Sequence, residues 1–267
     1  MRASRIKAKL KRNEPVLITT LHFHDPSLYE ITSLMGFDGI WMDLEHHALS
    51  VQRAGELMRA ARLGASDIVA RPAKGEFMRT GRLLEAGAQG IMYPRCESAT
   101  EAQEVVRWSK FAPMGTRGID GGNPDVPYLS MPIADYIKLA NDETFIIIQI
   151  EDSAGLEQAE AIASIDGVDI LMLGPGDFSI LGGFPGQFDD PRIEQAAQKI
   201  GTAAANAGKH WGMPCFSKDH GSRLLEMGAR FLPYSGDFGI MKAGLKAIQT
   251  EMGPLGFEFD NRLGEHT

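Results

Sequence analysis

An α/β fold, closed as a (β/α)8 TIM barrel, is the fold class that this 267-residue sequence predicts. Short apolar runs alternate with helix-period segments eight times, which is the pattern of a parallel sheet covered by helices. Eight units average about 33 residues each, close to the usual barrel unit. No Gly-x-Gly-x-x-Gly motif opens the first unit, which disfavours an open dinucleotide-binding sheet. No boundary interrupts the pattern, so we expect residues 1–267 to form a single domain.

The expected strands are runs of apolar, β-branched residues typical of strands buried on both faces. In chain order they are 16–23, 39–44, 67–71, 90–94, 144–150, 169–173, 211–216 and 231–235. The expected helices are 26–35, 51–63, 77–86, 99–110, 133–139, 156–164, 192–207, 219–226 and 238–251. Helix 133–139 is additional to the eight units and follows a glycine- and proline-rich insertion at 114–132. We expect this long connection to be a lid or an interface element.

Glycine is abundant, with 30 residues, and segments such as LMGFDGI, EAGAQGIM and EMGARFL place it between a helix and the next strand. A left-handed glycine there would end the helix. The basic start, MRASRIKAKLKRN, lacks the apolar run of a signal peptide, and we expect a solvated first helix there. Cys96 and Cys215 are far apart in the sequence and are expected to be buried free thiols.

The net charge of -8 and the pI near 5.4 exclude functions that need a basic face, so we expect no nucleic-acid partner and no membrane partner. No run of eighteen apolar residues occurs, and we expect a cytoplasmic protein. The composition, 43% hydrophobic and 23% charged, is that of a globular protein with a sizeable core.

Polar residues gather where the expected strands end, which is where the active sites of such barrels lie. They are His22, His24, Asp43, Glu45, His46, His47, Arg71, Gln149, Glu151, Asp152, Asp177 and Asp237. Charged groups at buried strand ends are costly unless they are paired or bind a metal. Their convergence is the main functional signal in the sequence.

Glu151 and Asp177 follow neighbouring strands and are candidate metal ligands. Two carboxylates without a thiolate suit a hard divalent cation such as Mg²⁺ or Mn²⁺, completed by water or substrate oxygens. Each could instead cap the helix or loop that follows it. The pair together, with an arginine nearby, favours metal binding.

Arg71 is held extended by the next proline and should point its guanidinium into the barrel mouth, where it suits a carboxylate, a phosphate or an enolate oxygen. Its alternative role is that of a buried partner for Asp43 or Glu45, and the two roles are compatible. His46 is a candidate general base. The glycine-rich segment Gly174, Pro175 and Gly176 could bring backbone amides to an anion. For His22, His24 and His47 a structural role is the first expectation.

These residues alone suit a small α-keto acid whose carboxylate and keto oxygen are held by a metal and by Arg71, with an enolate stabilised during carbon–carbon bond making or breaking. No lysine stands at an obvious strand end, so a Schiff-base mechanism is not favoured.

The sequence also resembles the HpcH/HpaI class II aldolases, a family with 4-hydroxy-2-oxoheptanedioate and 2-keto-3-deoxy sugar-acid aldolases. The matching segments are GFDGIWMDLEHHALS, IVARPA, LLEAGAQGIMYPRCESATEAQEVV, FAPMGTRGI, IIIQIEDSAGLEQAEAIASIDGVDILMLGPGDFSILGG and LPYSGDFGIM. The resemblance extends from about residue 16 to residue 241, and the combined order D-x-E-H, R-P, Q-x-E and G-P-x-D-x-S is specific.

The resemblance implies a role for each matching residue. Glu151 and Asp177 would be the metal ligands, Arg71 would contact the pyruvyl enolate, and His46 would act through metal-bound water in proton transfer at the aldol hydroxyl. The supporting positions would be Asp43, Glu45 and Gln149. Glu85 stands where the family has an aspartate that supports the histidine, and the longer carboxylate could serve. The resemblance further implies Mg²⁺, Mn²⁺ or Co²⁺ as cofactor and a hexamer in which the last helices swap.

The expected function is therefore reversible aldol cleavage of a 4-hydroxy-2-oxo acid to pyruvate, or a related 2-oxo acid such as hydroxypyruvate, and an aldehyde. Its partners would be these small molecules, in aromatic or sugar-acid catabolism. The alternatives are an acyl-CoA thioester lyase of the same superfamily and a non-catalytic barrel that binds a keto acid. Guesses for the walls of the aldehyde pocket are Val126, Tyr128, Leu181 and Pro214.

Overall fold

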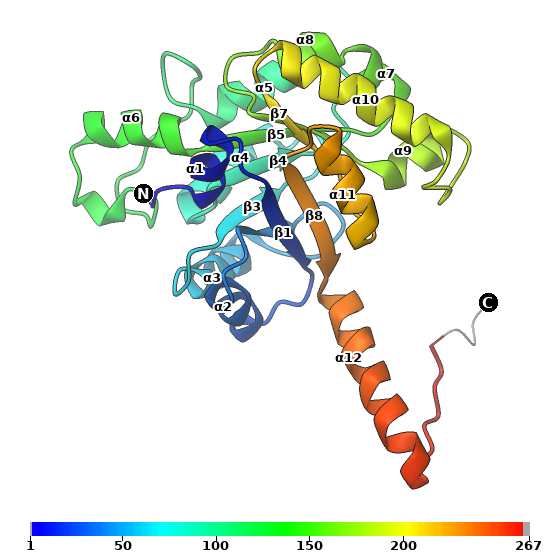
Figure 1. Ribbon diagram of the computed structural model, residues 1–267. Helices are drawn as coiled ribbons and strands as arrows, with labels where there is room; N and C mark the ends of the chain where they lie inside the picture. The colour runs from blue at the N-terminus through cyan, green and yellow to red at the C-terminus, as the bar shows by residue number, and fades with distance from the viewer. Residues whose placement is uncertain (1, 264–267) are drawn as a thin grey trace.

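A computed structural model describes residues 2–263 and shows a closed barrel in which each strand is parallel to the next, in the order β1 to β8. The strands are β1 (Val16–Leu21), β2 (Gly39–Asp43), β3 (Asp67–Arg71), β4 (Gly90–Tyr93), β5 (Phe145–Ile150), β6 (Ile170–Leu173), β7 (His210–Gly212) and β8 (Phe231–Gly236). Figure 1 shows the barrel surrounded by helices. The predicted (β/α)8 barrel is confirmed, and all eight predicted strands are present.

The helices begin with α1 (Arg5–Lys11), which precedes the barrel, and α6 (Ile133–Glu143) is the predicted additional helix. Those that follow strands are α2 (Pro26–Leu34), α3 (Val51–Ala61), α4 (Phe77–Ala86), α5 (Ala99–Ser109), α7 (Ser153–Glu157), α8 (Ala159–Ala163), α9 (Pro175–Leu181), α10 (Pro191–Asn206), α11 (Lys218–Glu226) and α12 (Asp237–Met252). Short 3-10 turns occur at Pro127–Leu129 and Gly253–Leu255. Gly87 and Gly228 end α4 and α11 at positive φ, as the sequence predicted.

Helix α1 closes the amino-terminal end of the barrel, which we call the floor. Ile6 and Leu10 are buried in one apolar cluster with residues from inside the barrel, such as Ile18 and Phe145. Gly39 permits this contact, because a Cβ there would lie 2.8 Å from Ile6 Cδ1. The expected first helix is present, but the expectation that it is solvated is wrong for the face that carries Ile6 and Leu10. The polar side of α1 faces outward while its apolar side completes the core.

The insertion at 114–132 lies at the floor, because it connects α5 to the start of β5 through α6. Arg117 and Asp125, both buried within it, form an ion pair of 3.1 Å, and Asp125 also accepts a hydrogen bond from Tyr136 of α6. The interpretation of this insertion as a lid over its own barrel mouth is wrong, since the mouth is at the other end of the strands. The alternative, an interface element, stays a prediction.

Two other local predictions differ from the structure. The glycine-rich segment after β6, where no helix was expected, forms α9, with Gly174 as N-cap and Pro175 as first residue. Strand β7 ends at Gly212, and beyond it Cys215 forms only an isolated bridge with Tyr234. The expected buried thiols are confirmed for Cys96 and Cys215.

Helix α12 leaves the barrel mouth and projects away from the body of the molecule (Figure 1). Among its residues only Asp237 is buried. Its exposed apolar side chains are Phe238, Ile240, Met241, Leu245 and Ile248. No helix in residues 2–263 is both long enough and apolar enough to cross a membrane.

Candidate active site

The mouth of the barrel contains a buried pair at the ends of β2 and β3. Asp43 and Arg71 are the last residues of these strands and are register partners, so their side chains emerge together. Arg71 donates from Nε to Asp43 Oδ1 at 3.0 Å and from Nη2 to Asp43 Oδ2 at 2.8 Å. Burial opposes ionisation of Asp43, but these bonds outweigh it and lower its pKa. The guanidinium also lies 4.6 Å from the Trp41 ring centroid, which fixes its plane.

Gln149 and Glu151 extend this pair along β5. Arg71 Nη1 donates to Gln149 Oε1 at 3.4 Å, and Gln149 Nε2 donates to Glu151 Oε1 at 3.3 Å. The Arg95 amide donates to Glu151 Oε2 at 2.8 Å. Asp43, Arg71, Gln149 and Glu151 are therefore one connected row of buried polar side chains, which we call the mouth row. All its members were predicted site residues.

The surroundings of Glu151 disfavour the charged form of its carboxyl group. Its pKa is raised to about 7, chiefly by burial, and the nearby carboxylates of Asp177 and Glu45 contribute to the rise. The Arg95 amide and Arg71 act in the opposite direction. Asp177 lies half-buried in the first turn of α9. Gly174 allows the Glu151 carboxylate to pack against the start of α9, because the Cβ of any other residue at this position would collide with that carboxylate.

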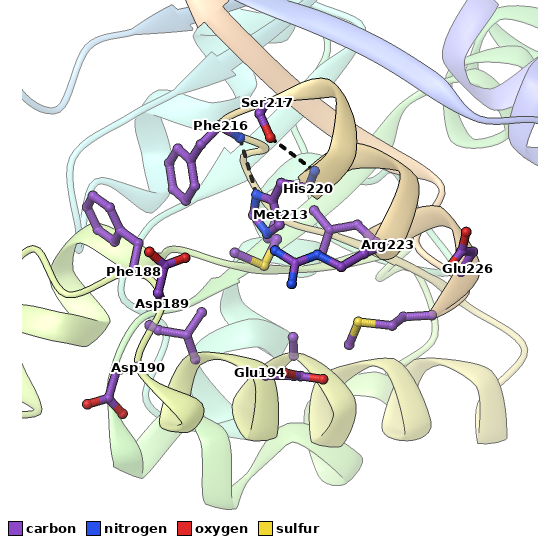
Figure 2. A pocket seen from close by; sticks show the side chains of 14 residues that line it. Phe188, Asp189, Asp190, Glu194, Met213, Phe216, Ser217, His220, Arg223 and Glu226 are labelled. Carbon is purple, nitrogen blue, oxygen red and sulfur yellow. Dashed lines mark hydrogen bonds between the residues drawn. The ribbon is translucent and has the colours of Figure 1, made fainter.

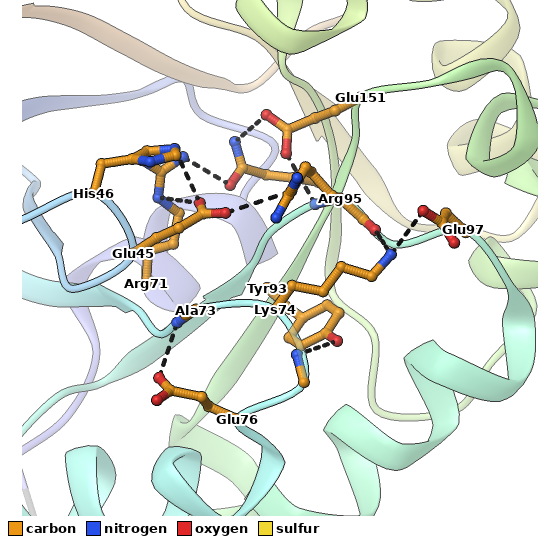
Figure 3. Close-up of polar contacts among 12 residues, drawn as sticks. Glu45, His46, Arg71, Ala73, Lys74, Glu76, Tyr93, Arg95, Glu97 and Glu151 are labelled. Atoms are coloured by element: carbon orange, nitrogen blue, oxygen red, sulfur yellow. Dashed lines mark hydrogen bonds and ion pairs between the residues drawn. The ribbon is translucent and has the colours of Figure 1, made fainter. Parts of the chain in front are cut away.

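Glu45 lies between three basic side chains. Its carboxylate is 3.3 Å from Arg71 Nε, 3.5 Å from His46 Nε2 and 3.6 Å from Arg95 Nε (Figure 3). Its side chain is only 5% exposed, and neither oxygen has a hydrogen bond from the described residues. Burial raises the pKa of Glu45 despite Arg71. His46 is exposed at the opening, where it can reach a bound molecule.

The histidines at the β1 and β8 side of the mouth form a separate group. His22 Nδ1 lies 2.8 Å from Asp237 Oδ1, and the amides of His22 and Phe23 donate to Asp237 Oδ2. The rings of His22 and His47 are 4.5 Å apart, and burial together with His22 lowers the pKa of His47. Asp237 thus joins the end of β1 to the first residue of α12. This arrangement agrees with a structural role for His22.

Glu85 is not brought to the mouth. It lies near the end of α4, which runs back to the floor, and its charged neighbours are Arg117, Asp120 and Asp125 of the insertion. Burial raises its pKa. The expected support of His46 by Glu85 is not made within one chain, because the two residues belong to opposite ends of the barrel.

The four residues suggested as walls of the aldehyde pocket also lie at opposite ends of the barrel. Val126 is buried against Phe111 and Tyr136 in an apolar cluster of the insertion, and Tyr128 is exposed in the same segment. Neither can line the mouth of its own barrel. Leu181 is exposed at the end of α9, and Pro214 follows β7, so both lie on the mouth side.

The sequence prediction missed Arg95. It follows β4, has a positive φ of 44°, and places both its amide and its guanidinium in the site. Its position two residues after the end of β4 was a signal that could have identified it, since Arg71 was found from its position at the end of β3. Lys74 is another basic residue near the opening, where its Nζ donates to the Arg95 carbonyl at 2.6 Å and pairs with Glu97 at 2.9 Å.

A pocket of about 540 Å³ lies elsewhere, on the outer wall between α10 and α11 (Figure 2). Phe188, Phe216 and His220 stack along one side of it, with centroids 4.8 and 5.3 Å apart. None of the predicted site residues lines it. The convergence of buried charges at the mouth makes that end the candidate active site.

A model of the HpcH/HpaI aldolase/citrate lyase family matches residues 21–238. The chain belongs to this family. A hydroxypyruvate/pyruvate aldolase from Delftia acidovorans is 30% identical over 90% of this chain and 89% of its own length. A 4-hydroxy-2-oxo-heptane-1,7-dioate aldolase from Shigella sonnei is 28% identical over 92% and 94%. The crystal structure of an HpcH/HpaI aldolase from Desulfitobacterium hafniense has a TM-score of 0.86 at 28% identity and covers 96% and 98% of the two chains.

Proposed function

We propose that this member of the HpcH/HpaI family is a metal-dependent class II aldolase, a carbon–carbon lyase. It would cleave a 4-hydroxy-2-oxo acid reversibly to pyruvate, or a related 2-oxo acid such as hydroxypyruvate, and an aldehyde. The observation that carries the proposal is the mouth row, Asp43, Arg71, Gln149 and Glu151, with Asp177 beside it. The names of the aldolase relatives from Delftia acidovorans and Shigella sonnei support it.

A divalent cation fits the donors at Glu151 and Asp177. Glu151 and Asp177 follow neighbouring strands, and the pKa of Glu151 is raised first by burial and also by the charge of Asp177, both of which a bound cation would counter. Each Glu151 oxygen accepts one hydrogen bond and keeps a second lone pair. Within residues 2–263 no group of three or more His, Cys, Asp or Glu side chains has metal-binding geometry, so water and substrate oxygens would complete the shell. Mg²⁺, Mn²⁺ and Co²⁺ are the candidate ions.

The chain's own residues can account for the proton and electron movements of cleavage. The bound metal would act as a Lewis acid toward the substrate's 2-oxo group. His46 takes the proton of the C4 hydroxyl while the C3–C4 bond breaks and its electrons move to the C2 oxygen. Arg71 stabilises the resulting enolate oxygen, and Asp43, Gln149 and Trp41 hold its guanidinium in place. Protonation of the enolate at C3 gives pyruvate.

The assembly is proposed to be a hexamer in which α12 packs on a neighbouring subunit. The apolar residues of α12 are exposed, and so are Leu17 of β1 and Ile31 and Leu34 of α2. Such surfaces mark sites of association. Light scattering of wild type and of the double variant Leu245→Glu/Ile248→Glu tests this, and an unchanged mass would contradict the role of α12. The cytoplasmic location stays a prediction.

The function is tested by incubating the purified protein with pyruvate or hydroxypyruvate and an aldehyde, with and without chelator. We expect aldol product only with metal, restored by Mg²⁺, Mn²⁺ or Co²⁺ after chelation. Chelator-insensitive product formation would contradict the metal mechanism. Glu151→Ala should abolish both the rate and metal binding measured by calorimetry.

The same assay decides between the alternatives. An acyl-CoA thioester lyase would act on thioesters and not on free acids; the likeness to a citrate lyase beta subunit, at 17% identity and a TM-score of 0.57, concerns the fold alone. A non-catalytic barrel would bind pyruvate without turnover, and Glu151→Ala would then change only binding or stability.

A further inference from the structure

Arg95 is held in an unusual backbone conformation that directs its side chain across the mouth. Its φ of 44° is in the left-handed region, which non-glycine residues seldom adopt. The conformation is fixed on both sides, because the Arg95 amide donates to Glu151 and the amide of buried Cys96 donates to the Gln149 carbonyl at 3.0 Å. Strained positions of this kind persist where surrounding contacts over-determine them, and they gather at functional sites.

The guanidinium groups of Arg71 and Arg95 differ in how many of their N–H donors are free to bind a ligand. Arg71 is buried, and three of its five N–H donors are used by Asp43 and Gln149, which leaves one on each terminal nitrogen for the 2-oxo acid. The Arg95 side chain is 45% exposed, and its closest charge is Glu45 at 3.6 Å, beyond hydrogen-bond range. Among residues 2–263 its guanidinium makes no hydrogen bond within the protein. Figure 3 shows it between Glu45 and Glu151, one of the proposed metal ligands.

The position of Glu45 explains how Arg71 and Arg95 can lie in the same site. Its buried carboxylate lies between Arg71 and Arg95, so the two positive groups can occupy one site without direct repulsion. A substrate for such a site has two anionic groups. One is the carboxylate of the 2-oxo acid, which the mouth row takes up, and the other is on the aldehyde part and would lie nearer the opening.

Resting on the proposed aldolase function, we propose that Arg95 binds an anionic group, a carboxylate or a phosphate, on the acceptor aldehyde and selects such aldehydes over neutral ones. A guanidinium presents paired donors to both anions. The proposal rests on the free N–H donors of the Arg95 guanidinium and on its exposure beside Glu45 and Glu151. Lys74 is a poorer candidate, because Glu97 and the Arg95 carbonyl already occupy its ammonium group.

The experiment compares kcat/KM of the metal-loaded enzyme for matched aldehydes with pyruvate as donor. Succinic semialdehyde and butanal differ by a carboxylate, and glyceraldehyde 3-phosphate and glyceraldehyde differ by a phosphate. Arg95→Asn is the test variant because asparagine tolerates a left-handed backbone. We expect the anionic-to-neutral ratio of kcat/KM to fall by roughly 10- to 100-fold, the usual size of a charge-assisted hydrogen bond. Arg95→Lys should keep part of the preference.

Arg79→Gln is the matched control, since Arg79 is a partly exposed arginine of α4 that pairs with Glu76. Its ratio should equal that of wild type. A ratio that Arg95→Asn leaves unchanged, with both aldehydes slowed alike, would overturn the proposal and make Arg95 a partner of Glu45 only. A loss confined to one pair identifies the anion as carboxylate or phosphate. No product from any aldehyde, neutral or anionic, would refute the aldolase function itself and the proposal with it.

Discussion

Glu151 at the mouth and Asp67 at the floor are both buried carboxylates whose pKa burial raises, to about 7 and about 6 respectively. Asp67 accepts hydrogen bonds from Ser4 Oγ at 2.7 Å and from the Ile6 amide at 2.8 Å, and these contacts attach α1 to the barrel. Glu151 accepts hydrogen bonds from the Arg95 amide at 2.8 Å and from Gln149 Nε2 at 3.3 Å, and the carboxylates of Asp177 and Glu45 add to the rise in its pKa. Both acids therefore accept two hydrogen bonds from the chain, and they differ in their charged neighbours: Asp67 has Arg2 at 3.8 Å, whereas Glu151 has two other acids nearby as well as Arg71. The comparison indicates that a buried acid used for structure lies beside a basic group, whereas one proposed for chemistry lies among other acids, where a cation can balance the charge.

The largest expected effect is at the mouth. Glu151→Gln should lower kcat by about 1,000-fold or more, because a proposed metal ligand is removed. Its melting temperature should be equal to or higher than that of wild type, since a buried charge is removed as well. Turnover assays and thermal melts measure the two effects. Glu157→Gln, an exposed acid nearby in α7, is the control, and retained activity in Glu151→Gln would contradict the comparison.

Arg71→Lys should lower kcat/KM by roughly 100- to 1,000-fold, the cost of losing one stabiliser of a developing oxyanion. Lysine keeps the charge but cannot make the paired bonds to Asp43. Steady-state kinetics at saturating metal test this, with Arg79→Lys as control. A loss below tenfold would indicate that charge alone matters at this position.

At the floor the effect should be on stability. Asp67→Ala should lower the free energy of unfolding by about 2–3 kcal/mol, because buried donors of Ser4 and Ile6 lose their acceptor. Activity per folded molecule should stay that of wild type. Urea denaturation measures the stability, with Asp166→Ala, an exposed acid, as control. An activity loss without a stability loss would reverse the assignment of the two ends.

Asp67 also predicts a pH dependence. Its folded pKa, about 6, lies above the unfolded value, so its contribution to stability is fully present below the unfolded pKa and is lost as pH rises through about 6. The stability of wild type relative to Asp67→Asn should therefore fall between about pH 4 and pH 7. Parallel denaturation curves over this range test the sign, and a rising difference would contradict it.

The smallest effect is expected at Asp237, a mouth carboxylate satisfied by its own chain. Asp237→Asn should reduce the free energy of unfolding by about 1 kcal/mol, because it weakens the hydrogen bonds to His22 and Phe23. Chemical denaturation would detect it, with Asp25→Asn at the exposed N-cap of α2 as control. A loss of activity as large as that of Glu151→Gln would mean that this acid also serves the chemistry.

The sequence by itself determined the barrel and the mouth row. Strand and helix periods are local properties, and parallel strands bring their carboxyl ends to one edge, so strand-end position alone places Asp43, Arg71, Gln149 and Glu151 together. Register then pairs Asp43 with Arg71 directly. The position of a residue at a strand end and its chemical type can both be taken from the sequence, and together they were sufficient to predict the mouth row.

Only the tertiary structure decided which surfaces meet. The apolar side of α1 fits the barrel floor, Glu85 lies with the insertion at that same end, and α12 leaves the mouth without packing on its own barrel. The left-handed turn that directs Arg95 toward Glu45 depends on hydrogen bonds to β5 and to Glu151 beyond it, far later in the sequence. Such contacts form when the barrel closes, and no local sequence pattern encodes them. An amphipathic segment or a charged residue indicates that it needs a partner, but the partner itself is determined by the tertiary structure.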